Sequence, residues 1–337
     1  MSARIRCALI GFGYWGPNLL RNLSDLTDAE VRVVCDPRPD LAARIGHRYP
    51  GVETAADFGA VLARTDIDAF VIATPPQFHA SMGLAALDSG RHVWIEKPLA
   101  TTMRDAERLV DRAKARGLTL MVDHTFVYTG AVRKMRDLVA AGELGRVLYY
   151  DSVRVNLGLV QSDVSVLWDL AVHDLSIMDY VIGAKPVAVS ALGVAHVVRQ
   201  PVSIAYLTTF CEGGFIGHCH VNWLAPVKIR RTLVGGDRRM IVYDELDPDF
   251  KVKLFDSGVD LNPRDLKVNY RTGDVHIPQL DRTEALALAT RHFVECIRSG
   301  AQPITGPEAG LRVVQILEAA ERSMARQGEA VSLEPVS

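Results

Sequence analysis

Short apolar runs alternate with amphipathic segments along the first third of the chain. The runs are apolar at most positions and fall at 5–10, 31–35, 69–73, 92–95 and 118–122. Strands with two buried faces are typical of a parallel sheet covered by helices on both sides. Helical spacing of apolar residues separates the runs, at 16–23, 40–47, 58–64, 80–88 and 102–116. We therefore predict a doubly wound α/β domain over residues 1–125.

The pattern changes after residue 125. A long strand-like run occupies 147–155, and from 187 to about 275 strand-like runs are joined by Gly-rich turns. Such a succession of strands and tight turns favours an antiparallel sheet. Helical segments are predicted at 131–141, 166–180, 283–298 and 307–326. We predict an α+β domain with an open, mostly antiparallel sheet over residues 126–337.

The composition narrows the class of protein. With 337 residues the chain has room for two packed domains, and 48% apolar and 23% charged residues are typical of a folded globular protein. A net charge of −2 gives no indication of nucleic acid or an anionic membrane as a partner. No apolar run approaches the roughly 18 residues of a membrane span. The five cysteines are scattered without CxxC spacing, which favours a reduced, cytoplasmic setting.

The first predicted strand is followed by Gly11-Phe12-Gly13-Tyr14-Trp15-Gly16, which matches GxGxxG and opens the first helix. A strand before and a helix after this pattern form the context of a dinucleotide site. The glycines let the main chain turn tightly and approach a pyrophosphate, which the N–H groups at the helix start can bind. We predict that residues 11–15 bind the cofactor. The alternative is a tight turn that binds no ligand.

Asp36 ends the second predicted strand, in the position from which a carboxylate accepts hydrogen bonds from the adenosine ribose. A carboxylate there repels a 2′-phosphate, which favours NAD. Arg38 lies two residues further on and offers a cation for a 2′-phosphate, so NADP is the alternative. Without a cofactor, Asp36 would be a turn-forming aspartate before Pro37.

Glu96-Lys97-Pro98 follows the strand predicted at 92–95. The carboxyl edge of such a sheet is where α/β folds bind ligands. A lysine there can donate a hydrogen bond to a reacting oxygen and stabilise the negative charge that develops on it during hydride transfer. The alternative is a solvated lysine paired with Glu96.

These motifs, together with Asp169-xxx-His173, resemble the glucose–fructose oxidoreductase / inositol dehydrogenase / rhizopine catabolism (Gfo/Idh/MocA) family over nearly the whole chain. The segments 13–18 and 154–158 are most similar to members that act on nucleotide-linked sugars, namely UDP-sugar 3-dehydrogenases and 3-ketosugar reductases. The resemblance implies a Rossmann domain, a tightly held nicotinamide cofactor and an open sheet used for homodimer or homotetramer formation. It also implies that Lys97, Asp169 and His173 are catalytic.

Asp169 and His173 are four residues apart, which places them on one face of the helix predicted at 166–180. Histidine is the side chain best suited to exchange a proton near neutral pH, and a nearby aspartate can orient it or bind a substrate hydroxyl. The alternative is a pair that stabilises the helix. Leu170-Ala171-Val172 separate the two, where many family members have glycine before the histidine. Tyr180 is the fallback acid.

Further candidates lie at the ends of other predicted strands. Thr74, Pro75 and His79 follow the strand at 69–73, and the family resemblance favours a position beside the cofactor. His124 follows the strand at 118–122, at the same edge as Lys97, and we predict that it binds substrate. Turn and surface roles are the alternatives for these residues.

Arg154 and Asn156 alternate along the strand predicted at 147–155 and its continuation, so they share a face. Arginine suits a substrate carboxylate or phosphate, and we predict that both residues bind substrate, with a plain surface strand as the alternative. His218 and His220 also share a strand face, but two histidines without a third ligand seldom bind a metal, so we predict no metal site.

The sequence thus predicts an NAD(P)-dependent oxidoreductase acting on a ring secondary alcohol of a sugar, with a UDP-linked sugar and its C3 position favoured. Three alternatives stay open. They are an NADPH-dependent 3-ketosugar reductase, an inositol or free-sugar dehydrogenase, and a non-catalytic NAD(P)-sensing protein.

Overall fold

The computed structural model describes residues 4–335 except 47, 159, 162–163, 198–200 and 262–267. The chain divides into two compact units. The first contains Met1–Tyr128 and Thr283–Val314, and the second contains Thr129–Arg282 and Gln315–Ser337. Each unit is built around one sheet.

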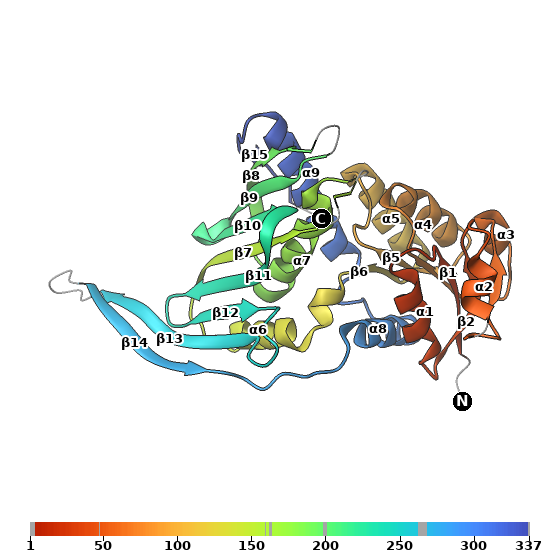
Figure 1. Cartoon of the computed structure of the whole chain (residues 1–337), viewed down its shortest axis with the longest axis horizontal. Helices are drawn as coiled ribbons and strands as arrows, with labels where there is room; N and C mark the ends of the chain where they lie inside the picture. The colour runs from red at the N-terminus through yellow and green to blue at the C-terminus, as the bar shows by residue number, and fades with distance from the viewer. Residues whose placement is uncertain are drawn as a thin grey trace. The chain divides into compact units, whose positions relative to one another are not determined.

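The sheet of the first unit is parallel, with the strand order β3-β2-β1-β4-β5-β6 (Figure 1). Its strands are β1 (Ile5–Ile10), β2 (Ala29–Cys35), β3 (Glu53–Ala55), β4 (Ala69–Ile72), β5 (His92–Glu96) and β6 (Leu120–Asp123). The strands β4 and β6 are buried at every position, as expected for a sheet covered on both faces. This order places a topological switch between β1 and β4, the arrangement of a Rossmann domain. The predicted fold class is confirmed.

Helices join the strands in the order that the apolar spacing predicts. They are α1 (Gly16–Ser24), α2 (Leu41–Gly46), α3 (Phe58–Leu62), α4 (His79–Asp88) and α5 (Met103–Arg116), with single turns η1 (Pro76–Phe78) and η2 (Thr125–Tyr128). The bounds of α5 follow from its ends. Thr102 accepts a hydrogen bond from the Asp105 N–H at 3.2 Å, and Gly117 takes a left-handed conformation with φ of 63°.

Residues 283–314 differ from the sequence-based boundary, which assigned them to the second domain. Helix α8 (Ala285–Ser299) belongs to the first unit. The ring of Phe293 lies 5.5 Å from that of Trp94 on β5, and the Val122 N–H donates to the Thr305 carbonyl oxygen at 2.8 Å. An amphipathic helix has an apolar face but no signal that names its partner, so the sequence pattern alone could not place α8.

The second unit contains the strand order β14-β13-β12-β11-β7-β10-β9-β8-β15 (Figure 1). Among the described residues, β7 and β10 pair in parallel and the other neighbouring strands pair antiparallel. The strands are β7 (Val147–Leu157), β8 (Pro186–Val194), β9 (Ile204–Cys211), β10 (Ile216–Asn222), β11 (Leu224–Gly236), β12 (Met240–Asp244), β13 (Val252–Leu261), β14 (Val268–His276) and β15 (Val331–Ser332). The predicted antiparallel sheet is confirmed.

The remaining helical segments of the second unit are α6 (Gly130–Ala140), η3 (Leu167–Ala171), α7 (Val172–Ile182) and η4 (Glu212–Gly214), and α9 (Pro307–Ala325) contributes residues to both units. Helix α7 packs on one face of the sheet, where Tyr150 of β7 donates a hydrogen bond to the Asp174 carbonyl oxygen at 3.0 Å. No helix among the described residues is long and apolar enough to cross a membrane.

Side chains at the strand positions that alternate with the buried ones are exposed, and several of them are apolar. Tyr206 and Phe210 on β9 are 47% and 38% exposed, and Leu192 and Ile216 on the flanking strands are 56% and 45% exposed. The strand register pairs Leu192 with Tyr206 and Ile216 with Phe210, so two cross-strand apolar pairs lie four residues apart along the same face of β9. We call Leu192, Tyr206, Phe210 and Ile216 the apolar sheet patch.

Candidate functional site

In the phosphate loop, residues 11–16, two of the glycines lie very close to other main-chain atoms. Gly11 has φ of +92°, and a Cβ atom there would lie 2.4 Å from the Ala73 carbonyl oxygen. A Cβ atom on Gly16 would lie 2.7 Å from the Gly11 carbonyl oxygen. Only glycine fits these two positions, because any side chain would collide with main-chain atoms. Gly13, by contrast, faces open space.

The start of α1 suits an anion. Its first turn, Gly16-Pro17-Asn18, contains no acidic residue, and the Trp15 side chain before it does not cap the helix. Pro17 has no N–H and the Asn18 N–H donates to the Trp15 carbonyl oxygen at 2.9 Å, but the helix dipole favours negative charge at this end of α1. Together with the open space at Gly13, these features fit the pyrophosphate of a dinucleotide.

Asp36 stands at the end of β2, next to this loop. It is 8% exposed, and its Oδ2 atom accepts a hydrogen bond from the Phe12 N–H at 2.7 Å. The Arg38 guanidinium pairs with the same carboxylate at 2.7 and 2.9 Å. Burial acts to raise the pKa of Asp36, but the hydrogen bonds from Arg38 and Phe12 outweigh it and hold the pKa below its ordinary value. The predicted ribose carboxylate and the predicted 2′-phosphate cation are thus joined in one ion pair.

Lys97 follows the last residue of β5, at the carboxyl edge of the sheet, and a cis peptide bond joins it to Pro98. Its N–H donates to Oε2 of Glu96 at 3.1 Å. Glu96 also shares a side-chain hydrogen bond with Asp123, its register partner on β6. Burial, and then the neighbouring Asp123, raise the pKa of Glu96 well above its ordinary value. The sequence alternative, in which Glu96 acts as the ion partner of a solvated Lys97, does not fit these contacts.

His79 has a different position from the one predicted. Its side chain is fully buried, and its two ring nitrogens lie 2.8 Å from the carbonyl oxygens of Pro98 and Thr74. Burial and the nearby Lys97 charge lower its pKa, although both carbonyl contacts act in the other direction. His79 therefore contacts the main chain around the site and presents no ring nitrogen to a cofactor. Thr74 lies against the phosphate loop, since its N atom is 2.9 Å from where a Cβ of Gly11 would be.

His124 follows β6 and is 1% exposed. Neither of its ring nitrogens has a hydrogen-bond partner among the described residues. Burial and the charge of Lys97 lower its pKa to about 3, so the ring is neutral at physiological pH. A buried polar group without a partner is costly, and such groups are common where a ligand or water completes the contacts. The geometry thus favours the predicted ligand-binding role of His124.

Asp169 and His173 do not share one regular α-helix. Asp169 lies in η3, a π-helical turn, and His173 lies in the first turn of α7. Both residues are half-buried, and Asp169 accepts a hydrogen bond from the Trp223 indole at 3.1 Å. Single π turns inside helices are frequent at functional sites. The single helix predicted at 166–180 was wrong at this point, because apolar spacing does not distinguish a π turn from an α turn.

Arg154 is an internal ion-pair residue, which corrects its predicted role. It is 3% exposed, and its guanidinium contacts Asp174 at 2.9 Å and Glu245 at 3.0 Å. Burial raises the pKa of Asp174, and the Arg154 charge opposes that effect. With its donors directed to two carboxylates, Arg154 is not positioned as a cation for substrate. Asn156, two residues along β7, is half-buried.

Comparisons with known proteins identify the family. Residues 5–124 match the family model described as the oxidoreductase family with an NAD-binding Rossmann fold, and residues 132–242 match the GFO/IDH/MocA C-terminal domain. The chain belongs to the Gfo/Idh/MocA family. The first match lies within the first structural unit and the second lies within the second unit.

Named relatives in this family act on chemically different substrates. The chain is 25% identical to a 4-carboxy-2-hydroxymuconate-6-semialdehyde dehydrogenase from Sphingobium, over 96% of this chain and 100% of the relative. It is 24% identical to the NAD-dependent scyllo-inositol 2-dehydrogenase of Bacillus subtilis, over 90% and 89% of the two chains. It is 34% identical to dTDP-3,4-didehydro-2,6-dideoxy-α-D-glucose 3-reductase of Saccharopolyspora spinosa, over 40% of each chain.

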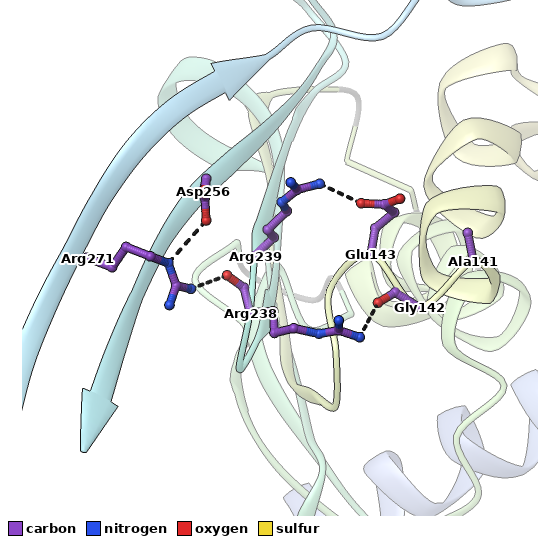
Figure 2. Close-up of a pocket in the computed structure, with 7 residues that line it drawn as sticks. All are labelled: Ala141, Gly142, Glu143, Arg238, Arg239, Asp256 and Arg271. Carbon is purple, nitrogen blue, oxygen red and sulfur yellow. Dashed lines mark hydrogen bonds and ion pairs between the residues drawn. The ribbon is translucent and has the colours of Figure 1, made fainter. Parts of the chain in front are cut away.

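The second unit also contains a pocket away from the residues that the Gfo/Idh/MocA motifs single out. It has a volume of about 360 Å³ and is lined by the turn after α6, the turn between β11 and β12, and strands β13 and β14 (Figure 2). Its three guanidinium groups are engaged. Arg238 donates to the Gly142 carbonyl oxygen, Arg239 pairs with Glu143, and Arg271 pairs with Asp256 (Figure 2). Because each cation already has a partner, we assign no ligand to this pocket.

Three residues that contact the predicted site residues were not predicted from the sequence pattern. Trp223 binds Asp169, and Asp174 and Glu245 hold Arg154. Their partners are distant in the chain or on another element, so no local spacing could reveal them. Among the described residues, no group of three histidine, cysteine or acidic side chains is arranged to hold a metal ion.

Proposed function

We propose that this protein is an NAD(P)-dependent oxidoreductase that interconverts a secondary alcohol and a ketone on the ring of a nucleotide-linked sugar. NAD is the favoured cofactor, UDP the favoured nucleotide and C3 the favoured carbon. The observation that supports this most is the grouping in the first unit of the phosphate loop, the Asp36 carboxylate, and Lys97 next to a buried His124 whose ring nitrogens have no hydrogen-bond partner among the described residues.

Each residue has a definite part in the proposed reaction. A bound nicotinamide supplies the hydride acceptor or donor. Lys97 donates a hydrogen bond to the reacting oxygen and stabilises its alkoxide character. His173 takes the hydroxyl proton during oxidation and returns it during reduction. Asp169, held by Trp223, orients His173 or binds a substrate hydroxyl. His124 contributes a neutral ring that can hydrogen-bond the substrate.

The cofactor assignment is supported by the family and by Asp36. A buried carboxylate whose pKa is held low stays ionised and accepts hydrogen bonds from ribose hydroxyls. Arg38 neutralises that carboxylate in the ion pair, so NADP is the alternative cofactor for the reductase direction.

A substrate screen tests the proposal. Purified protein is mixed with NAD⁺ or NADP⁺ and with UDP-sugars, dTDP-sugars, free sugars or inositols, and absorbance at the nicotinamide band is followed. Turnover of a nucleotide sugar, and a ketone at C3 of the product by NMR, would support the proposal. Turnover of free sugars or inositols alone would contradict the nucleotide-sugar assignment.

An inositol or free-sugar dehydrogenase is the second candidate. The scyllo-inositol relative aligns over 90% of this chain, whereas the dTDP-sugar relative aligns over 40%. The screen separates the two by the effect of the nucleotide group on KM. A non-catalytic sensor would bind NADH and turn over none of the compounds, and the presence of Lys97, Asp169 and His173 argues against it.

A further inference from the structure

A chain of hydrogen bonds connects the phosphate loop to Lys97 within the first unit. The Trp15 indole Nε1–H donates to Oδ2 of Asp123 at 2.9 Å. Asp123 shares a side-chain hydrogen bond with Glu96, whose Oε2 atom accepts the Lys97 N–H at 3.1 Å. We call Trp15, Asp123, Glu96 and Lys97 the loop-to-lysine chain. It starts at the residue before α1 and ends at the main-chain N–H of Lys97, whose side chain is the proposed polarising group.

The sheet itself brings the two carboxyl groups together. Glu96 is the last residue of β5 and Asp123 the last residue of β6, and the parallel register pairs them directly. Residues paired in register point to the same face, so their side chains must meet. Two ionised carboxylates in contact would repel each other strongly. The Glu96–Asp123 pair is therefore stable when one of its two carboxyl groups is protonated.

The hydrogen-bond partners decide which carboxyl group holds the proton. Asp123 accepts from Trp15 through Oδ2 and from the Thr125 hydroxyl through Oδ1 at 2.7 Å. Both of its oxygens thus face donors, which suits a carboxylate. Glu96 accepts the Lys97 N–H with one oxygen, and its other oxygen is left to donate an O–H to Asp123. Glu96 is therefore the acid and Asp123 the carboxylate.

The surrounding charges agree with this assignment. Burial and Asp123 raise the pKa of Glu96 well above its ordinary value, and the charge of Lys97 opposes them. His79 and His124, which also feel the charge of Lys97, have lowered pKa values because both are buried. The His124 ring is neutral near pH 7 and adds no positive charge that would ionise Glu96.

We propose that Asp123 is a positioning residue that links the phosphate loop to Lys97 through a protonated Glu96. The link fixes the main chain of Lys97 relative to the loop that binds the cofactor. One hydrogen-bond network therefore determines the position of Lys97 relative to a bound dinucleotide. This inference rests on the proposed role of Lys97 in hydride transfer. Its central statement, a neutral Glu96 held by Asp123, stands on contacts that do not depend on the substrate.

Infrared spectroscopy tests the protonation state without any substrate. The difference spectrum between wild type and Glu96→Gln, recorded at pH 7 in H₂O and in D₂O, should show the carbonyl band of a protonated carboxylic acid in the wild type only. Asp123→Asn should shift or remove that band, because Glu96 loses its carboxylate acceptor. A difference spectrum that contains only carboxylate bands would overturn the proposal.

Binding of NADH, followed by nicotinamide fluorescence, tests the link itself. Asp123→Asn and Trp15→Phe should each weaken NADH binding on the order of tenfold, since each breaks a hydrogen bond to a charged group. Thr125→Val is the matched control, because it removes the other donor to Asp123 and leaves the loop-to-lysine chain intact. Equal NADH affinities of Asp123→Asn and Thr125→Val would contradict the proposal.

The conservative variant separates positioning from a merely structural role. The Gln side chain in Glu96→Gln can donate to Asp123 and accept from Lys97, as a protonated glutamic acid does, whereas Glu96→Ala can do neither. Glu96→Gln should therefore bind NADH on the order of tenfold more tightly than Glu96→Ala. Equal losses in the two variants, with urea unfolding showing both folded, would overturn the proposal. Failure of the substrate screen leaves these three measurements unaffected, so the two proposals can fail separately.

Discussion

The Nδ1 atom of His79 lies 2.8 Å from the carbonyl oxygen of Pro98, the residue that follows Lys97. The other ring nitrogen lies 2.8 Å from the Thr74 carbonyl oxygen, so one buried ring bridges the segments that end β4 and β5. His79→Phe keeps the volume of the ring but removes both polar contacts. We expect it to lower the free energy of unfolding by about 2–4 kcal/mol, measured with urea. Ser81→Ala, at an exposed position of the same helix, is the control, and equal stability of the two variants would contradict the bridge.

The Asp36–Arg38 ion pair should determine cofactor preference. Asp36→Asn removes the charge that repels a 2′-phosphate and releases Arg38 to bind it. We expect the ratio of NADPH to NADH affinity to rise on the order of tenfold or more, measured by fluorescence titration. The double variant Asp36→Asn/Arg38→Ala should lose most of that gain. Tighter binding of NADPH than of NADH by the wild type would refute the NAD assignment.

Turnover should depend on Lys97 and His173. Lys97→Ala and His173→Ala should each reduce kcat on the order of 10²–10⁴-fold on the substrate found in the screen, because both residues act mainly in the transition state. His173→Ala should keep nearly normal NADH affinity. Asp169→Asn preserves shape and should reduce kcat less than His173→Ala. Near-normal turnover of His173→Ala would transfer the proton role to Lys97 or Tyr180.

The free energy of unfolding at acid pH should depend on the fact that the folded protein holds the His124 ring neutral. Its folded pKa is lowered to about 3 by burial and by Lys97, whereas an unfolded histidine titrates near 6.5. Between these values the unfolded chain binds one more proton, so the stability that His124 contributes is complete above about pH 6.5 and falls as the pH falls. The slope is at most about 1.4 kcal/mol per pH unit for this group.

His124→Phe should therefore flatten the pH dependence of the free energy of unfolding between pH 4.5 and 6.5. The other histidines with lowered pKa values are present in both proteins and cancel in the comparison; they are His79, His92, His220 and His292. Parallel curves for wild type and His124→Phe would show that His124 is not held neutral by the fold.

The apolar sheet patch should mediate self-association. Two cross-strand apolar pairs on one face of β9, with side chains 38–56% exposed, form a surface that a second copy can cover. We expect a homodimer or homotetramer by light scattering at micromolar concentration. Tyr206→Glu, which disrupts one of the two pairs, should shift the mass toward the monomer, whereas Lys185→Glu, before β8, should not. A monomeric wild type would contradict this expectation.

The sequence predicted the parallel sheet well because its strands are buried on both faces, and such runs are visible without knowledge of partners. The phosphate loop and Lys97 were predicted for a related reason. Their positions follow from where a strand ends. The same reasoning singled out His124, but it could not pair Asp123 with Glu96, since register is a property of two strands together.

The surroundings of Arg154 could not be predicted from the sequence alone. Alternation along β7 shows that Arg154 shares a face with Asn156, yet it does not say whether that face meets solvent or helix α7. The carboxylates that hold Arg154 come from α7 and from the residue after β12, and neither lies near it in the sequence. His79 is similar, because a histidine that opens a helix has the same local signal whether it faces a ligand or a buried carbonyl oxygen.

Because residues 283–314 belong to the first unit, the order in which the chain is synthesised affects the folding of that unit. A ribosome releases β5 before Phe293, which packs on Trp94, and before Thr305, which bonds to Val122, because residues 129–282 are translated in between. Until then the nascent chain presents the flank of Trp94 without its cover, and the N-terminal sheet cannot reach its final form. A fragment that stops after residue 128 would expose the same surface permanently, so it would need a chaperone or would aggregate.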